Sequence, residues 1–513
     1  PVDLKTTLTY DGTHLVPASE SVNLVDKVEY SGLTKGTKAL VKGELHAFDA
    51  EDNDLGVVAK AEKEFDVTST SGNVEVNFDN VNTLDEKAEK FVAYEFLYQN
   101  GQLVAEHKDP KDPSQTVTKP QIKTNLSGDI EQEANASSEI IKLVDKVTYK
   151  GLEVGKNYNL TGTLMDKETG KAFLDKDGKE ITATTTFAPT KSEGSVDVVF
   201  EFKNVDIAGK TVVAFETLEH NGVKLAVHAD INDKDQTVTL PKVKTNATSA
   251  NGLKEIAADK EQKIIDKVTL SNLIVGKTYK LSATAHVKDM AGKDLGELKD
   301  KDGKVVIVEK EFTADSKDMT VDMEVTVDAS LLGGNSAVMF EKLSRDGVVV
   351  GLHADITDED QTVKVPKVGT TLTDESGSHT VNTKAGTEVT LIDTIAYSNL
   401  TVGTKYTAEG ELHIGKVDKD GNVVDGGVLK DKNGKPVVAT AEFTPEKTDG
   451  TATVTFKFNV DSLDGIEKVV AFETVKNGNI IVATHADIKD ANQTVTFKVE
   501  PKPEQPTNKV KLK

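Results

Sequence analysis

The sequence contains four copies of one unit, and this repetition restricts the fold more than any other feature of the chain. Three blocks recur in the same order, and in the first copy they read LVDKVEYSGLTKG (24–36), FVAYEFL (91–97) and HKDPKDPSQTV (107–117). The later copies of these blocks begin at 143, 212 and 228, at 264, 337 and 353, and at 391, 469 and 485. Because each copy of such a repeat is one structural unit, we predict four domains. They are called repeats 1 to 4 and span 1–119, 120–240, 241–366 and 367–499, with a Pro- and Lys-rich tail at 500–513.

Within each repeat the hydrophobic pattern has a period of two. Segments such as NVEVNF (73–78) and SVDVVFEF (195–202) alternate apolar and polar residues, as half-buried strands do. Asp-Gly turns, as in DKDGK at 175–179, separate these segments and indicate hairpins. Seven or more short strands in about 120 residues predict an all-β chain of tandem immunoglobulin-like β-sandwich domains, arranged end to end through short joints. Helix is expected only in short pieces, for example at 83–90.

Charge and composition exclude several kinds of partner. The chain has 62 Lys and Arg against 85 Asp and Glu, a net charge of −23, which disfavours nucleic acid and anionic membrane surfaces. It lacks an apolar run of about 18 residues, so we expect no membrane insertion in this segment. Without cysteine it has neither disulfides nor thiolate metal sites. The DKDG turns lack the ligand ladder of an EF-hand, and we expect no metal and no cofactor. The chain is interpreted as part of a longer, acidic protein.

Several polar residues recur where the fold does not require them. A Glu lies inside the otherwise apolar second block, where a carboxylate is costly unless it is paired; these are Glu95, Glu216, Glu341 and Glu473. The third block keeps a His, an Asp five residues later and a Gln three beyond that. They are His107, Asp112 and Gln115; His228, Asp233 and Gln236; His353, Asp358 and Gln361; and His485, Asp490 and Gln493. A Thr in the first expected strand of each repeat completes the set: Thr6, Thr124, Thr245 and Thr370.

In a single repeat these residues would be ordinary: Thr is common in strands, QTV suits an edge strand, and a lone His near acids is usually a solvated surface group. Their joint recurrence in all four repeats favours a function instead. A metal site is a competing interpretation, because the His and first Asp of HAD share one face of a strand. It explains neither the Thr nor the Gln, and zinc usually takes several His or Cys ligands.

These motifs resemble those of the VaFE-type, Thr-Gln ester-crosslinked domains of Gram-positive surface adhesins. The VAFE strings at 213–216 and 470–473 and the HxDxxDxxQT strings of all four repeats carry the resemblance, which covers 1–499. It implies an immunoglobulin-like fold in which a Thr of the first strand and a Gln of the last form an intramolecular ester, assisted by the Glu, His and Asp. Repeat 1 departs from the motif with VAYE and two prolines, and repeat 3 with VMFE followed by Lys342.

The residue types fit such a reaction. A Thr hydroxyl needs a base before it can attack, and a Gln amide needs its carbonyl oxygen stabilised. In repeat 2, His228 is a candidate to take the proton of Thr124, and we expect Glu216 and Asp233 to share a proton that polarises Gln236. Which group is acid and which is base stays open, because such a set titrates together. Ammonia leaves, each domain reacts once, and no turnover enzyme is expected.

A covalent bond between the first and last strands would let tension bypass the rest of the sandwich. We therefore expect the stalk or spacer of a cell-wall-anchored adhesin on the extracellular surface of a Gram-positive bacterium. Binding of a host ligand and attachment to peptidoglycan would belong to parts of the protein outside this segment. The alternative is a ligand-binding adhesin module whose loops contact host protein or glycan. A hydrolase built on the His, Asp and Glu would need an open cleft and turnover.

Overall fold

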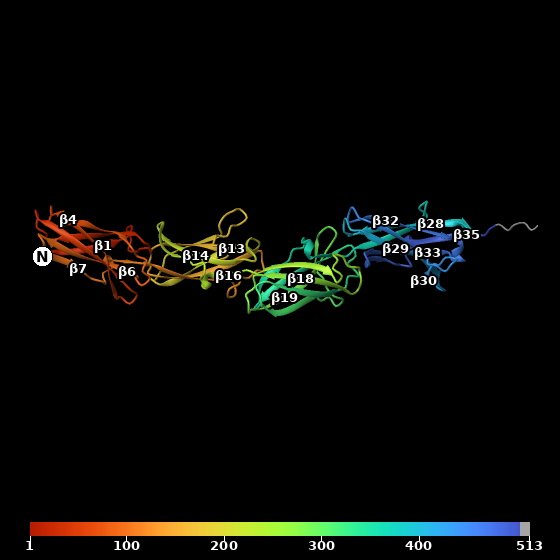
Figure 1. Ribbon diagram of the computed structural model, residues 1–513, viewed down its shortest axis with the longest axis horizontal. Helices are drawn as coiled ribbons and strands as arrows, with labels where there is room; N and C mark the ends of the chain where they lie inside the picture. Colours follow the sequence, from red (N-terminus) through yellow and green to blue (C-terminus); the bar gives the residue numbers. More distant parts are fainter. Residues whose placement is uncertain (503–513) are drawn as a thin grey trace, which may run out of the picture. The chain divides into compact units, whose positions relative to one another are not determined.

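The computed structural model describes residues 1–502 and consists almost entirely of β-strands (Figure 1). This confirms the all-β prediction. Its contacts divide the chain into two units, one of Pro1–Pro241 with Asp346–Val350, the other of Lys242–Arg345 with the chain from Gly351 onward. The predicted tail at 500–513 lies outside the described residues except for its first three, of which Glu500 ends strand β35.

Repeat 1 forms two antiparallel sheets. The smaller sheet, in the order β1-β2-β5, contains β1 (Asp3–Thr9), β2 (Val22–Ser31) and β5 (Gly72–Val81). The larger sheet, in the order β4-β3-β6-β7 with β8 beside β6, contains β3 (Lys38–Phe48), β4 (Asp54–Asp66), β6 (Lys90–Gln99), β7 (Gln102–His107) and β8 (Thr116–Thr118). The first strand therefore belongs to one sheet and the last strand to the other.

Repeat 2 follows the same plan. Its three-stranded sheet contains β9 (Gln121–Ser127), β10 (Ile140–Lys150) and β13 (Gly194–Lys203). Its second sheet contains β11 (Tyr158–Asp166), β12 (Thr182–Phe187), β14 (Thr211–His220), β15 (Val223–His228) and β16 (Thr237–Thr239). A short helix, α1 (Asn204–Ile207), follows β13.

Repeats 3 and 4 keep the three-stranded sheet and enlarge the other. The small sheets are β17 (Lys242–Ser249), β18 (Gln262–Ser271) and β22 (Met319–Val327), and β26 (Lys367–Asp374), β28 (Glu388–Ser398) and β32 (Gly450–Asn459). The larger sheet of repeat 3 has β19 (Thr278–Lys288), β20 (Asp294–Glu297), β21 (Ile307–Thr313), β23 (Ser336–Arg345), β24 (Val348–His353) and β25 (Thr362–Lys364). That of repeat 4 has β27 (Thr380–Lys384), β29 (Tyr406–Val417), β30 (Val423–Val428), β31 (Val438–Phe443), β33 (Lys468–Asn477), β34 (Ile480–His485) and β35 (Thr494–Glu500).

The alternation that predicted the strands also builds the core. In β2, Leu24, Val28 and Tyr30 point inward, while Val25, Lys27 and Glu29 on the other face are more exposed. This is the expected pattern for a sheet with one face packed on a partner sheet. Asp26 occupies an inward position of the same strand and is completely buried. A carboxyl at a core position requires a specific partner.

The helix expected at 83–90 was wrong, because this segment is irregular with a turn. The Lys119 Nζ donates hydrogen bonds to the carbonyl oxygens of Thr83 and Asp85, at 2.9 and 2.7 Å. In a helix that begins here, these carbonyl oxygens would accept the first backbone hydrogen bonds of the helix. Within residues 1–502, no helix is long and apolar enough to cross a lipid bilayer.

Candidate functional site

In each repeat the recurring polar residues come together between the two sheets. In repeat 1, Thr6 lies on β1 of the small sheet, and Glu95 and His107 lie opposite each other on β6 and β7 of the large sheet. Directly opposed residues of antiparallel strands have neighbouring side chains on the same face. Thr6, Glu95 and Gln115 are all buried, with Glu95 and Gln115 fully enclosed. The same three positions are buried in the other repeats.

The Gln lies on a one-turn 3-10 helix just before the last strand, rather than in that strand as the sequence predicted. In repeat 1 this helix is η1 (Pro113–Gln115), and it contacts β1, which carries the Thr. The equivalent helices are η2 (Lys234–Gln236), η3 (Glu359–Gln361) and η5 (Ala491–Gln493). The Gln115 Nε2 donates to the carbonyl oxygens of Ala93, at 2.6 Å, and His107, at 3.0 Å. These bonds hold the amide plane against strand β6.

The Asp of the third block positions the His and the helix. The Asp112 Oδ2 lies 2.7 Å from the His107 Nε2, and its Oδ1 accepts a hydrogen bond from the Ser114 backbone N–H at the start of η1. Although burial opposes the change, the hydrogen bonds from His107 and Ser114 lower the pKa of Asp112. The equivalent His–Asp distances in the other repeats are 2.7, 2.7 and 2.8 Å. A carboxylate that binds one ring nitrogen fixes the orientation of the imidazole.

A different carboxyl faces the Glu, and the sequence analysis did not select it. It is the Asp of the first block, which lies on the second strand and is fully buried in every repeat: Asp26, Asp145, Asp266 and Asp393. The prediction that Glu216 is paired with Asp233 was therefore wrong, because Asp233 binds His228 while Glu216 neighbours Asp145. A signal was present in the sequence. The Asp occurs in all four first blocks, two residues from apolar residues on the same strand face.

Burial favours the protonated form of both carboxyls in this pair. In repeat 1, burial is the largest cause that raises the pKa of Glu95, and Asp26 raises it further; burial also raises the pKa of Asp26. No N–H group donates to either carboxyl. Two adjacent carboxyls without a compensating donor cannot both ionise in a low-dielectric site. The pair is therefore able to give a proton to one neighbour and take one from another.

In two repeats a backbone N–H donates a long hydrogen bond to the side-chain carbonyl oxygen of the Gln. The Asp109 backbone N–H donates to the Gln115 Oε1 at 3.3 Å, and the Asp487 N–H donates to the Gln493 Oε1 at 3.3 Å. In repeats 2 and 3 the oxygens of Gln236 and Gln361 are buried without a hydrogen-bond partner. A buried carbonyl oxygen with spare acceptor capacity is ready to receive a proton or a further hydrogen bond.

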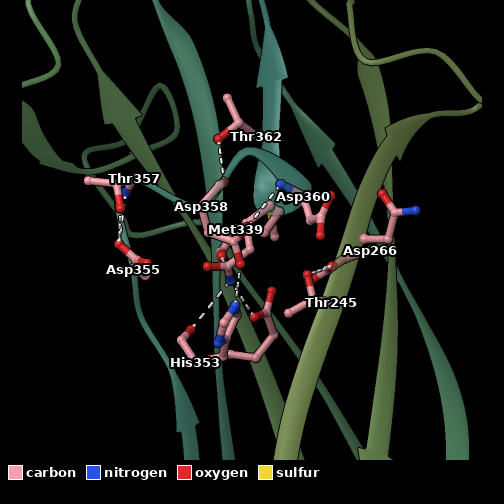
Figure 2. Close-up of polar contacts among 12 residues, drawn as sticks. Thr245, Asp266, Met339, His353, Asp355, Thr357, Asp358, Asp360 and Thr362 are labelled. Carbon is pink, nitrogen blue, oxygen red and sulfur yellow. Dashed lines mark hydrogen bonds and ion pairs between the residues drawn. The ribbon is translucent and has the colours of Figure 1, made fainter. Parts of the chain in front are cut away.

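Repeat 3 shows the contact between the hydroxyl and the first-block Asp most directly. The Thr245 Oγ1 donates a 2.7 Å hydrogen bond to the Asp266 Oδ1, and Figure 2 shows the two side chains facing each other. His353 lies nearby, held by Asp358. Asp266 is therefore placed to accept the hydroxyl proton, a role for which the sequence offered the His as a candidate without deciding between acid and base.

The family comparison matches this geometry. The model of the T-Q ester bond containing domain matches the chain four times, at residues 2–119, 120–240, 241–365 and 366–497. The chain belongs to this family. The match confirms the resemblance predicted from the VAFE and HxDxxDxxQT motifs. Among curated protein sequences, none matches the chain.

Two solved structures are among those that match the chain. A bacterial adhesin from Mobiluncus mulieris, described as containing intramolecular disulfide, isopeptide and ester bond cross-links, is 15% identical. The alignment covers 50% of this chain and 88% of that chain, with a TM-score of 0.21. The native alpha-2-macroglobulin of E. coli is 9% identical over 97% of this chain and 40% of that chain, also with a TM-score of 0.21.

Proposed function

We propose that this T-Q domain chain is the stalk or spacer of a cell-wall-anchored surface adhesin of a Gram-positive bacterium. Each domain is crosslinked by an intramolecular ester between its own Thr and its own Gln. One observation carries the proposal: a buried Thr and a buried Gln lie on contacting elements beside a pair of buried carboxyls whose pKa values are raised by burial. Binding of a host ligand and attachment to the cell wall belong to parts of the protein outside this segment.

The reaction can be followed in repeat 2. Asp145, the more acidic of the two carboxyls, takes the hydroxyl proton of Thr124 while Oγ1 attacks the carbonyl carbon of Gln236. Glu216 stays protonated and donates a hydrogen bond to the carbonyl oxygen, where negative charge develops. The Cδ–Nε2 bond then breaks, and His228 relays the hydroxyl proton to the leaving nitrogen. An ester forms, one ammonia is released, and the domain does not turn over.

The position of the bond explains its value to a stalk. The Thr lies on the first strand and the Gln just before the last, in different sheets and more than 100 residues apart. Closing a loop of this length lowers the entropy of the unfolded chain by an amount equivalent to roughly 4 to 5 kcal/mol on the disulfide model. Force applied to the two ends of a domain passes through the ester, so the strands between them are not pulled apart.

Force spectroscopy tests the stalk function. A pulled chain with four esters should show no release of hidden length from any repeat, whereas Thr124→Ala should add one release of roughly 35 to 40 nm, the extended length of the freed segment. The substitution Thr7→Ala is the matched control, because Thr7 is exposed and lies beside the buried Thr6. Length release from all four repeats of the unmodified chain would contradict the proposal.

The buried carboxyls predict a pH dependence in a repeat that lacks the ester. In Thr124→Ala, burial holds the pKa of both Asp145 and Glu216 above the values of the unfolded chain, that of Asp145 at about 6. The folded repeat therefore binds more protons, and its free energy of unfolding should fall as pH rises, by up to about 1.4 kcal/mol per pH unit for each extra proton bound. This stabilisation is complete below about pH 4; the part due to Asp145 is lost as pH rises through about 6, and the part due to Glu216 goes on decreasing toward about pH 10.

Calorimetry checks this dependence. The transition of repeat 2 in the Thr124→Ala chain should move to lower temperature between pH 4.5 and 7.5. In Thr124→Ala with Glu216→Gln the movement should be much smaller, because the carboxyl pair is gone. Equal movement in both variants would show that other groups cause it.

A further inference from the structure

One position that faces the buried Glu differs between the repeats. The residue directly opposite the Glu on the neighbouring strand is Gly43, Gly162 and Gly410 in repeats 1, 2 and 4. In repeat 3 the same register position, opposite Glu341, is Ala283. A single methyl group thus distinguishes repeat 3 beside the carboxyl that the proposed reaction uses.

The three Gly positions have no room for that methyl group. A Cβ on Gly43 would lie 2.6 Å from the Glu95 Oε1, and one on Gly410 would lie 2.7 Å from the Glu473 Oε2. Real Cβ atoms do not approach oxygen so closely, so the carboxyl would have to move. Ala283 is fully buried and carries this Cβ. The Glu341 carboxyl therefore cannot take the position found in the other repeats.

The core of repeat 3 has space for the methyl group of Ala283, but this space does not extend to the Glu341 carboxyl. A Cβ on Gly43 would also lie 2.7 Å from the ring of Phe78, and repeats 2 and 4 have Phe200 and Phe456 beside their Gly. In repeat 3 the corresponding core residue is Val325, which is smaller. The Ala and Val together keep the sheets packed, so the displaced group is the carboxyl.

The Gln of repeat 3 makes an additional hydrogen bond as a result. The Gln361 Nε2 donates to the carbonyl oxygens of Met339 and, at 3.5 Å, His353, as two of the other Gln residues do at the equivalent positions, and in addition to the Glu341 Oε2 at 2.8 Å. The Nε2 atoms of Gln115 and Gln493 donate only to two backbone carbonyls each. Glu341 therefore accepts a hydrogen bond from the nitrogen that would leave, while the Gln361 Oε1, like the Gln236 Oε1 of repeat 2, is buried without a partner. A carboxyl in this position does not polarise the carbonyl oxygen.

We propose that the residue opposite the Glu is a positioning residue for ester formation. Gly leaves the carboxyl beside the first-block Asp and clear of the Gln amide nitrogen, whereas the Cβ of Ala283 displaces Glu341 so that it also accepts a hydrogen bond from that nitrogen, which slows the reaction in repeat 3. This inference rests on the proposed ester. We expect repeat 3 to react roughly tenfold more slowly than the other repeats, less than the 10²–10³ lost when an oxyanion donor is removed entirely.

The test follows all four repeats in one full-length chain. The chain is sampled at set times after cell-free synthesis, denatured and digested, and mass spectrometry measures the linked and unlinked Thr and Gln peptides of each repeat. Ala283→Gly should bring repeat 3 to the rate of the others. Gly162→Ala should slow repeat 2 roughly tenfold, while repeats 1 and 4 serve as internal controls.

A second variant separates positioning from misfolding. Gly162→Ala with Phe200→Val reproduces the pair found in repeat 3 and relieves the crowding against the ring. Repeat 2 of this variant should keep the slow exchange of its strand amides with deuterium and yet still form its ester slowly. Recovery of the full rate in this variant would show that crowding, not the carboxyl, caused the loss and would overturn the inference.

The remaining outcomes are also decisive. If repeat 3 of the natural chain already reacts as fast as its neighbours, or Ala283→Gly leaves its rate unchanged, the positioning role is excluded while the ester itself stands. If no repeat forms a linked peptide, the proposed function fails first.

Discussion

The intact protein should weigh about 68 Da less than its sequence mass, because each of four esters releases one ammonia of about 17 Da. The sequence mass is 55.2 kDa, so a denaturing mass spectrum resolves a difference of this size. The deficit arises because the ester oxygen comes from Thr and the departing nitrogen from Gln. Hydrolysis of the Gln amide also releases ammonia, but it adds water and leaves the mass almost unchanged, so it cannot produce this deficit.

Matched variants assign the deficit to single residues. Thr124→Ala should restore about 17 Da, one ammonia, and Thr6→Ala should do the same in repeat 1. The neighbouring Thr7→Ala should leave the deficit unchanged apart from the substitution itself, because Thr7 points away from the core. An unmodified mass for the natural chain would rule out the ester. Cleavage of the link by hydroxylamine would distinguish an ester from a Lys-Asn isopeptide.

Replacing Asp145 by Asn should prevent ester formation in repeat 2 on the timescale on which the other repeats complete it. Asn cannot accept the hydroxyl proton of Thr124, and loss of a general base typically costs 10²–10⁴ in rate. Peptide mapping of the full chain should then show the linked peptides of repeats 1 and 4 but only unlinked Thr124 and Gln236. The effect is large because Asp145 and Thr124 are buried, so bulk solvent has little access to replace the base.

The comparison with Asp233→Asn makes this prediction specific. Asp233 acts through His228 and the cap of η2, so its loss should slow the reaction less than the loss of Asp145. Equal loss in the two variants would show that the His–Asp pair, and not the buried Asp, supplies the base. Full ester formation in Asp145→Asn would remove Asp145 from the mechanism.

Much of the architecture was predictable from local sequence. The fourfold order of the three blocks indicated four similar domains, and the period-two alternation indicated strands, because a half-buried strand must place every second side chain in the core. The Thr, Glu, His and Gln were selected because each recurs as a polar residue where packing alone needs none. Residue spacing along one strand was sufficient for these inferences.

Only the tertiary structure decided which groups face one another. In sequence, Asp112 lies close to His107 and looked like the second carboxyl of the site, while Asp26 looked like one more polar residue of an alternating strand. The structure reverses their roles: β2 turns Asp26 inward with Leu24 and Val28, and the opposing sheet brings Glu95 to meet it. The register of β3 against β6 likewise decides that Gly43 borders the carboxyl, and the register of β19 against β23 places Ala283 there in repeat 3. Sequence spacing determines which side chains share a strand face, but contacts between two sheets depend on how those sheets pack.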